Sequence, residues 1–397
     1  MAQSRGEASW SNWSGSVSCR PVRAEQPGSE AALADLVRRA RDEKLSVRVA
    51  GTGHSFMPLV ASDGVVVLPG GLQGIESHDR DRLQVWVRSG TVLHDLGDPL
   101  LELGMAMANL GDIDVQTLGG ALATGTHGTG RTLGNLSSRV VAIRFVNAEG
   151  EVVTCSGEDD PELLRALRVS VGAVGAVSAA CLQLVPAYKL HERIVRASTD
   201  ECLEALESET RRHRHFEFFW YPHVDRVEMK SLDLTDEEPD DLPDRKGERI
   251  GWSPHIIPSV RELKFNEMEY AVPEEHGPAC FAAVRERIRT VHPDVVWPVE
   301  YRTLASDDAL LSTAHGRPTV TISVHQDGSL PFRDFFADVE PIFWDCGGRP
   351  HWGKVHTRTA RDLRQVYPRW EDFQTLREQH DPQGRFLNDH LRTLFLD

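Results

Sequence analysis

The sequence has no apolar run that approaches the about 20 residues of a membrane-spanning helix. Its amino-terminal segment, MAQSRGEASWSNWSG, also lacks the apolar core of a secretory signal peptide. These absences predict a protein without a membrane span that stays in the cytoplasm.

Basic residues are scarce relative to acidic ones. The chain has 44 Lys and Arg residues against 60 Asp and Glu residues, which gives a formal net charge of −16. A charge of this sign is repelled by a phosphate backbone and by an anionic membrane surface. We therefore expect no nucleic-acid partner.

Cysteine is also sparse, with 6 residues and no CxxC pair. A chain of 397 residues can bury a sizeable core and does not need disulfides to fold. This usage favours reduced thiols.

Three common catalytic motifs are absent. Neither glycine-rich run matches G-x-G-x-x-G with an acidic residue placed to hold a ribose, which disfavours a doubly wound NAD site. There is no G-x-S-x-G nucleophile elbow for acyl transfer. His351 and His356 do not form HExxH and have no carboxylate between them, so we expect no metal centre.

The length favours two domains, and the first half predicts mixed α/β layers. Runs of period two alternate there with runs of helical period. Pro99 is expected to kink or end a helix, and residues 147–150 are expected to form a hairpin turn. The predicted strands cover 45–50, 65–68, 83–87, 140–146, 152–155 and 177–185, and the predicted helices cover 31–44, 92–103 and 161–169.

From about Leu190 the pattern changes to that of an α+β domain. The acidic segment 233–244, DLTDEEPDDLPD, is expected to be a solvated loop. The predicted helices of this half cover 201–214, 332–339 and 360–365, and the predicted strands cover 216–221 and 320–324.

Two glycine motifs point to a ligand. The first, Gly51-Thr52-Gly53-His54-Ser55, follows a predicted strand, where glycines let backbone N–H groups face a phosphate and where Thr52 and Ser55 add hydroxyl donors. A tight turn between strands explains this motif equally well. The second run, from Gly119 to Gly130, is typical of a backbone that lies close against a ligand. A large, flat, phosphorylated ligand fits both.

Eight ordered blocks carry a resemblance along most of the chain. They are Asn12-Trp13, VAGTGHSF at 49–56, DVQTLGGALATGTHGTG at 114–130, VGAVGAVSAACLQLVP at 171–186, PVEYR at 298–302, GGRPHWGKVH at 347–356, YPRW at 367–370 and DPQGRFLNDHLRTLF at 381–395. In these blocks the chain resembles the FAD-linked oxidases of the vanillyl-alcohol oxidase type, and within them the sugar-1,4-lactone oxidases and alditol oxidases.

The resemblance implies an α+β fold with two parts. Residues 1–187 would form a two-subdomain FAD-binding (PCMH-type) domain, and residues 188–374 an α+β substrate-binding cap domain. Residues from about 375 to 397 can return to the first domain. A monomer or a small homo-oligomer is expected.

The implied cofactor is FAD, bonded covalently to His54. This residue occupies the position where these oxidases attach the flavin 8α-methyl group to an imidazole nitrogen. A neutral imidazole can act as the nucleophile, and the bond raises the redox potential of the flavin. Some relatives bind FAD without the bond, so a buried histidine that caps the turn is the alternative. The other implied cofactor-binding residues are Gly51, Thr52, Gly53, Ser55, Gly120, Gly125, Thr126, Gly128 and Val177.

Glu300, Arg302 and Lys354 are the residues implied for catalysis. Hydride transfer from a C–H bond needs removal of the hydroxyl proton, fixation of the substrate and stabilisation of negative charge. Glu300 and Arg302 are two residues apart, so on a strand both side chains face one side. The alternative for this pair is a cross-strand ion pair on the surface, and for Lys354 it is plain solvent exposure.

Three further residues are implied with the catalytic set. Thr117 matches a hydroxyl residue beside the flavin in alditol oxidases, although it also fits an ordinary core threonine. Ser323 and His325 stand where alditol oxidases carry a histidine and a threonine, which weakens the case for a polyol substrate.

The implied function is the oxidation of a small sugar-like alcohol, an aldono-1,4-lactone of the gulono or arabinono type, with molecular oxygen as acceptor and hydrogen peroxide as product. The alternatives are an alditol oxidase, a related FAD dehydrogenase, an oxidase of a secondary metabolite, and a flavoprotein fold kept as a binding scaffold. The presence of His54, Glu300, Arg302 and Lys354 together argues against a scaffold.

Overall fold

A small parallel sheet forms near the amino terminus. The structure is a computed structural model that describes residues 8–242 and 245–396. The sheet has the order β3 (Arg23–Glu25), β5 (Val65–Val67), β4 (Val47–Val49). Helix α1 (Glu30–Asp42) connects β3 to β4, and the three valines of β5 are buried, as expected for the central strand of a parallel sheet. The strands predicted at 45–50 and 65–68 and the helix predicted at 31–44 are confirmed.

A five-stranded antiparallel sheet follows. Its order is β10 (Val152–Ser156), β9 (Val140–Val146), β11 (Ala176–Gln183), β7 (Gln84–Arg88), β6 (Ile75–Asp79). The turn between β9 and β10 is held by Asn147, whose Oδ1 accepts hydrogen bonds from the backbone N–H groups of Glu149 and Glu151. Gly150 completes this turn with φ 76°. The predicted hairpin is confirmed.

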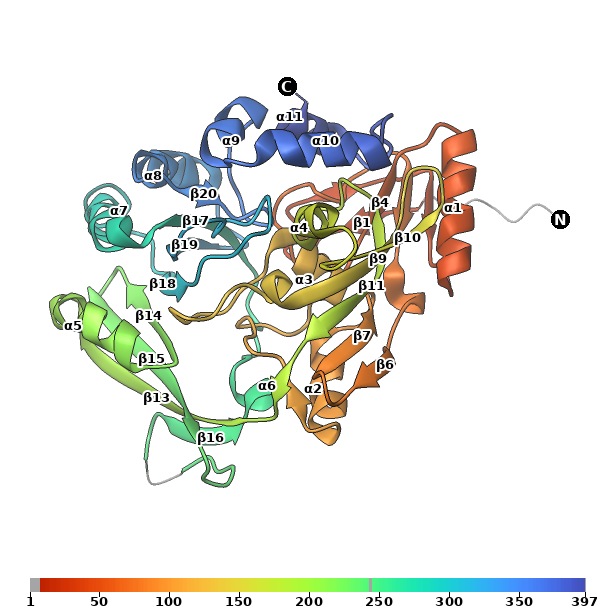
Figure 1. Cartoon of the computed structure of the whole chain (residues 1–397). Helices are drawn as coiled ribbons and strands as arrows, with labels where there is room; N and C mark the ends of the chain where they lie inside the picture. Colours follow the sequence, from red (N-terminus) through yellow and green to blue (C-terminus); the bar gives the residue numbers. More distant parts are fainter. Residues whose placement is uncertain (1–7, 243–244, 397) are drawn as a thin grey trace.

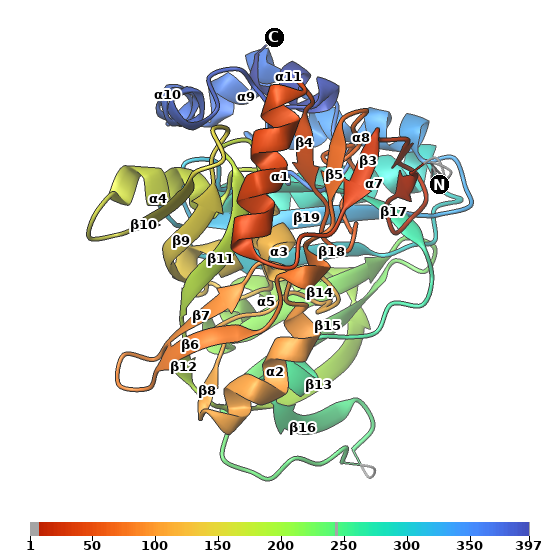
Figure 2. The ribbon, with the colours of Figure 1, turned by 90° about the vertical axis from the view of Figure 1, so that its right-hand side faces the viewer.

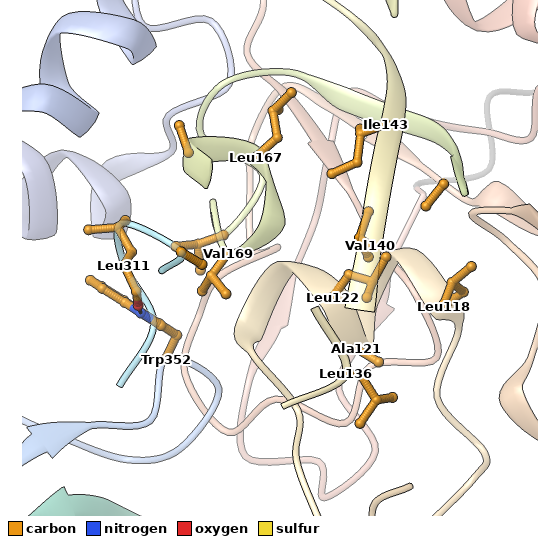
Figure 3. Packing of buried hydrophobic residues seen from close by; sticks show 14 of the residues in the cluster. Leu118, Ala121, Leu122, Leu136, Val140, Ile143, Leu167, Val169, Leu311 and Trp352 are labelled. Atoms are coloured by element: carbon orange, nitrogen blue, oxygen red, sulfur yellow. Dashed lines mark hydrogen bonds between the residues drawn. The ribbon is translucent and has the colours of Figure 1, made fainter. Parts of the chain in front are cut away.

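Helices α3 (Leu118–Thr124) and α4 (Pro161–Arg168) pack on this sheet. Leu118, Ala121 and Leu122 of α3 belong to the same buried cluster as Val140 and Ile143 of β9 (Figure 3). The first half of the second glycine motif is therefore helical, and its apolar side chains anchor it to the sheet.

Helix α2 (Leu93–Glu102) confirms the helix predicted at 92–103, whereas a kink at Pro99 stays a prediction. The helix does not end there but continues to Glu102. Pro99 has no N–H group to donate to the carbonyl oxygen of Asp95. Both residues are exposed, so water can bind that oxygen instead.

The second half is built on an eight-stranded antiparallel sheet. Its order is β16 (Glu248–Trp252), β13 (Lys189–Ser198), β15 (Arg226–Thr235), β14 (His215–Tyr221), β18 (Val299–Leu304), β19 (Thr319–Asp327), β17 (Phe265–Pro273), β20 (Arg349–Pro350). Helices α5 (Thr199–Arg212), α7 (Gly277–Val291) and α8 (Arg333–Asp345) cover one face of it (Figure 1). These elements confirm the predicted strands and the first two predicted helices of this half.

Alternation along the central strands gives this sheet one apolar and one charged face. Phe218 of β14, Tyr301 of β18 and Met268 of β17 point into the core beneath the helices, with Phe281 and Phe336. Because side chains alternate along a strand, the neighbours of these residues in sequence face the opposite side. That opposite face carries the charged residues described below.

The last helices lie against the amino-terminal half. They are α9 (Ala360–Val366), α10 (Trp370–His380) and α11 (Asp389–Phe395), and they run across the top of Figures 1 and 2 towards α1 and β4. Trp370 and Phe395 share a buried cluster with Leu167 of α4. The buried guanidinium of Arg48 also donates to the carbonyl oxygen of Phe386. The predicted division at residues 187 and 374 stays a prediction, although these contacts agree with a return of the carboxyl-terminal residues.

The acidic segment is only partly a loop. Residues 233–235 belong to β15, because Leu234 and Thr235 pair with Leu190 and Lys189 of β13. Residues 236–242 are largely exposed, with one bridge from Asp240 to Ile250, and residues 243–244 lie outside the described residues. The prediction of a loop from residue 233 is therefore wrong for the first three residues.

The remaining elements are short. They are β1 (Trp10–Ser11), β2 (Ser18–Cys19), β8 (Met105–Ala106), β12 (Val185–Pro186), α6 (Ser253–Ile256) and the 3-10 turns η1 (Pro69–Gly71), η2 (Leu136–Arg139) and η3 (Glu274–His276). Among residues 8–242 and 245–396, no helix has both the length and the apolar character to cross a membrane.

Candidate active site

A cavity in the amino-terminal half, which we call the cofactor cavity, lies between the turn at 51–55, α3 and β11. Eight of the predicted residues line it: Gly51, Thr52, Gly53, His54, Ser55, Thr117, Gly120 and Val177.

The backbone of the 51–55 turn has unused hydrogen-bond donors. Within the described part of the chain, the amide groups of these residues donate to no protein acceptor. Gly53 has φ 76°, and a Cβ on Gly51 would stand 2.3 Å from the hydroxyl oxygen of Thr117, so both positions require glycine. A turn with free amides and no side-chain bulk fits the diphosphate of a dinucleotide cofactor.

His54 lies where the cofactor cavity meets a second cavity, and it lines both. Its Nδ1 atom is 3.1 Å from Thr52 Oγ1, and its ring stacks on Trp13 with centroids 5.5 Å apart. Burial, together with the nearby charge of Lys354, lowers the pKa of His54 to about 4. The imidazole is therefore neutral at neutral pH and keeps a lone pair available as a nucleophile.

Three predicted cofactor residues lie outside the cofactor cavity. Gly125 is the C-cap of α3 with φ 71°. A Cβ on Gly128 would stand 2.0 Å from the carbonyl oxygen of Leu110, so this glycine permits close packing. Thr126 lines the second cavity instead. Their assignment to the cofactor stays a prediction.

The second cavity, which we call the charged cavity, lies against the open face of the eight-stranded sheet. It shares His54, Ser55, Gln116 and Thr124 with the cofactor cavity. The structure brings four of the predicted catalytic residues together on its walls: Glu300, Arg302, His325 and Lys354.

Glu300 and Arg302 form a buried pair on β18. Arg302 Nη2 is 2.8 Å from Glu300 Oε2 and 2.6 Å from Asp112 Oδ2, and Arg302 Nε donates to Glu217 Oε2 at 2.6 Å. The pair is thus not the surface ion pair that the sequence left as an alternative. Burial, only partly offset by the charge of Arg302, raises the pKa of Glu300. A carboxylate with a raised pKa is a suitable proton acceptor near neutral pH.

Lys354 reaches the charged cavity from the segment after β20. Its ammonium donates to Glu267 Oε2 on β17 and lies 5.3 Å from the centroid of the Phe56 ring. His325 stands nearby, with Nδ1 2.8 Å from the carbonyl oxygen of Pro298 and Nε2 3.6 Å from Glu267 Oε1. Lys354 is therefore engaged in the cavity and is not simply exposed to solvent.

Ser323 does not line the charged cavity. Its hydroxyl donates to Glu269 Oε2 at 2.9 Å, and Glu269 Oε1 lies 2.8 Å from His127 Nε2. His127 Nδ1 is 2.8 Å from the carbonyl oxygen of Gly128 and must donate to it, so the bond to Glu269 requires a second proton on the ring. Against the effect of burial, the charge of Glu269 raises the pKa of His127. The two form an imidazolium–carboxylate pair.

His351 completes a trio with His127 and Glu269 whose ligand atoms lie within 4.8 Å of one another. Two histidines and one carboxylate suit several transition metals. However, His351 Nδ1 accepts a hydrogen bond from the Gly353 amide at 3.1 Å, which places the proton of a neutral ring on Nε2. Neither ring nitrogen of His351 therefore has a free lone pair, and the trio cannot supply three metal ligands as it stands. The expectation of no metal centre stays a prediction.

Several residues of the charged cavity were missed by sequence reasoning. Glu267 and Glu269 are two residues apart in FNEMEY, the same spacing as Glu300 and Arg302, and that alternation was an available signal. Asp112 and Arg261 come from irregular segments and join only through the fold, with Arg261 Nη2 2.9 Å from Asp112 Oδ2.

Two families match this sequence. Residues 180–254 and 244–394 match the family described as D-arabinono-1,4-lactone oxidase, and residues 22–156 match the family described as FAD binding domain. The second match covers the 51–55 turn and α3, so the predicted FAD cofactor is confirmed.

Curated relatives span nearly the whole chain. The L-gulono-1,4-lactone dehydrogenase of Mycobacterium tuberculosis is 38% identical over 422 residues, which cover 96% of this chain and 98% of the relative. The L-gulonolactone oxidase of Mus musculus is 29% identical over 429 residues, which cover 97% of each. Among solved structures, a solvent-stable cholesterol oxidase aligns with a TM-score of 0.87 at 18% identity over 98% of both chains. This likeness confirms the predicted α+β fold.

Proposed function

This chain belongs to the D-arabinono-1,4-lactone oxidase family, and from that premise we propose that it is an FAD-dependent oxidoreductase of aldono-1,4-lactones. The observation that carries the proposal is the buried Glu300–Arg302 pair in a cavity that shares a wall with the cofactor cavity. The names of the two curated relatives support the same substrate class.

The chemistry of a lactone suits the charged cavity. Its hydroxyl groups are hydrogen-bond donors for carboxylates, and its ring carbonyl is an acceptor for cations. The cavity offers Glu300 and Glu267 for the first task and Arg261 and Lys354 for the second. A neutral lactone also leaves the mutual ion pairs of these residues intact.

In this proposal the residues of the 51–55 turn, with Gly120 and Val177, hold FAD. When bound, FAD supplies the hydride acceptor for the oxidised carbon. Glu300 takes the proton of the reacting hydroxyl, because its raised pKa matches a proton acceptor near neutral pH. Arg302, fixed by Asp112 and Glu217, holds Glu300 in position. Lys354 stabilises the negative charge that develops beside the cofactor.

We further propose that His54 carries the FAD covalently. The support is its place between the two cavities and its neutral ring at neutral pH. Trp13 stacks on that ring and limits its rotation. Stacking of this kind keeps the attacking nitrogen in one orientation.

Molecular oxygen is the proposed final acceptor, with hydrogen peroxide as product. One relative is named an oxidase and the other a dehydrogenase, so the family contains both types by name. The predictions of a cytoplasmic location and of a monomer or small homo-oligomer stay predictions.

Anaerobic reduction of the bound flavin tests the function. Gulono- and arabinono-1,4-lactone should bleach the flavin absorbance, and alditols such as xylitol should do so far more slowly. Bleaching by alditols alone would replace the lactone proposal with the polyol alternative. Readmission of air should then yield peroxide, and its absence would remove oxygen as the acceptor without affecting the lactone assignment.

A further inference from the structure

The segment between α6 and β17 brings an arginine, Arg261, to the charged cavity. Ser259, Val260 and Arg261 of this segment line the cavity, as does Asp112. The amide of Ser259 donates to the carbonyl oxygen of Asp112 at 2.8 Å, so the backbone of the segment is held at this wall. Arg261 therefore reaches the cavity from an anchored segment.

Arg261 lies close to Glu300, the proposed proton acceptor. Arg261 Nη2 is 3.9 Å from Glu300 Oε1, and His325 Nε2 is at the same distance from that oxygen. Both distances exceed the range of a hydrogen bond. In the described part of the chain, no group donates a hydrogen bond to Oε1, and Arg302 contacts the other carboxylate oxygen, Oε2. Oε1 therefore keeps its lone pairs for the reacting hydroxyl, with the Arg261 guanidinium beside it.

Arg261 differs from Arg302 in the donors that stay available to a ligand. The Arg302 guanidinium lies between three carboxylates, which are those of Asp112, Glu217 and Glu300. Among the described residues, Arg261 donates a single hydrogen bond, from Nη2 to Asp112 Oδ2 at 2.9 Å, and its Nε and Nη1 groups have no protein acceptor. Its side chain is 37% exposed, so a ligand in the cavity can reach these donors.

Lys354, the other cation offered to a carbonyl oxygen, is engaged elsewhere in the cavity. Its ammonium donates to Glu267 on β17 and lies over the ring of Phe56. Among the described residues, Lys354 makes no ion pair with Glu300, whereas Arg261 does at 3.9 Å. Of these two cations, Arg261 is therefore the neighbour of the proton acceptor.

The chemistry of an aldono-1,4-lactone matches this arrangement. Its ring carbonyl carbon is bonded directly to the carbon that carries the reacting hydroxyl, so the group that binds the carbonyl must lie next to the proton acceptor. A guanidinium offers only donors, and a carbonyl oxygen offers only lone pairs. A hydrogen bond from a charged donor is also stronger than one between neutral groups.

We propose that Arg261 binds the ring carbonyl oxygen of the lactone and thereby sets the preference for lactones over alditols. This inference rests on the proposed function and assigns its substrate recognition to one residue. An alditol carries a hydroxyl in place of the carbonyl, and Arg261 offers no acceptor for the hydrogen of that hydroxyl. Loss of Arg261 should therefore weaken lactone binding more than alditol binding.

Two ring compounds that differ only in the carbonyl test this contact. A 2-deoxyaldono-1,4-lactone keeps the carbonyl, and the matching 1,4-anhydro-2-deoxyalditol has a CH₂ group in its place. Both lack the reacting hydroxyl, so their binding to the oxidised holoenzyme can be measured by calorimetry without oxidation at that carbon. The unaltered protein should bind the lactone at least about tenfold more tightly, and Arg261→Met should remove most of this preference.

Two further variants complete the test. Lys264→Met removes a cation from an exposed position of the same segment outside the cavity, and this matched control should keep the full preference. Arg261→Lys, which keeps a cation but not the guanidinium, should restore part of it. An unchanged preference in Arg261→Met, or equal binding of the two compounds to the unaltered protein, would overturn the proposal.

The binding measurement is independent of the proposed function, because neither ring compound has the reacting hydroxyl. Bleaching of the flavin by gulono- or arabinono-1,4-lactone tests the proposed function alone. In that reaction, Arg261→Met should raise the lactone concentration that gives half the maximal rate of flavin reduction at least about tenfold, and should change the maximal rate much less. An unchanged half-saturating concentration would overturn the role of Arg261 and leave the lactone assignment intact.

Discussion

His127 Nε2 lies 2.8 Å from Glu269 Oε1, and the two side chains are 3% and 4% exposed. His127 belongs to the second glycine motif and Glu269 to β17, so this ion pair ties the amino-terminal half to the eight-stranded sheet. Buried pairs contribute little relative to apolar packing, but breaking one leaves an unpaired charge. The pair therefore fixes the relative position of the two walls of the charged cavity.

Replacement of His127 by Ala should destabilise the protein by about 3–5 kcal/mol, because Glu269 would remain buried without its partner. Chemical denaturation of the purified holoenzyme measures this loss. The control is His94→Ala, which removes an exposed histidine 2.8 Å from Asp114 and should cost less than about 1 kcal/mol. Equal losses in the two variants would contradict the role of the buried pair.

Glu300→Gln should lower the anaerobic rate of flavin reduction by about 100-fold or more, since the amide cannot accept the hydroxyl proton. Lactone binding should change much less. Glu274→Gln, which alters a carboxylate paired with Arg131 at 3.1 Å outside the charged cavity, is the matched control. An unchanged reduction rate in Glu300→Gln would assign proton removal to another group.

His54→Ala should convert covalent FAD into FAD that is released when the protein is precipitated with acid. Attachment of FAD to the apoprotein should proceed at a nearly constant rate between about pH 5 and 8, because the pKa of His54 is lowered to about 4 and the ring stays neutral. His78→Ala, at an exposed position of β6, should keep the bond. Fluorescence of the precipitate and of the supernatant measures both outcomes, and release of FAD from the unaltered protein would disprove the bond.

Most of the elements were predictable because their signals are local. The hairpin at 147–150 follows from turn residues between two apolar strands, and α4 begins at Pro161 with the Asp160 side chain as its N-cap. Pro99 does not end α2, because the cost of a proline depends on whether the carbonyl group that loses its amide partner can reach water. Residues 233–235 misled because their strand is imposed by pairing with β13, which lies far away in sequence.

The residues of the site were predictable only where they lie on the same strand. Glu300 and Arg302 face one side because of a period of two, which the sequence displays. Their partners Asp112 and Glu217 come from a loop and from β14, and only the tertiary fold brings them together. Ser323 shares the strand and the face of His325 but is covered by Glu269, so its position on a strand did not determine its access to the cavity.

Asp225 offers a test of stability that is independent of the active site. Its carboxylate accepts hydrogen bonds from Arg285 at 2.8 and 2.6 Å and from Trp220 Nε1 at 2.9 Å, and the bonds from Arg285 lower its pKa from the ordinary 3.8 to about 2. A depressed carboxyl pKa stabilises the folded state fully above 3.8, and this contribution is lost as the pH falls through about 2. Asp225→Asn tolerates the φ of 52° at this position and should lower the free energy of unfolding by about 2 kcal/mol at neutral pH. The difference from the unaltered protein should shrink below about pH 4 in acid titrations of stability.

Asp200→Asn, which removes a 77% exposed carboxylate from the same Arg285, is the matched control and should show a small, nearly pH-independent effect. A deficit in Asp225→Asn that persists unchanged to about pH 3 would show that geometry, and not charge, is what Asp225 contributes.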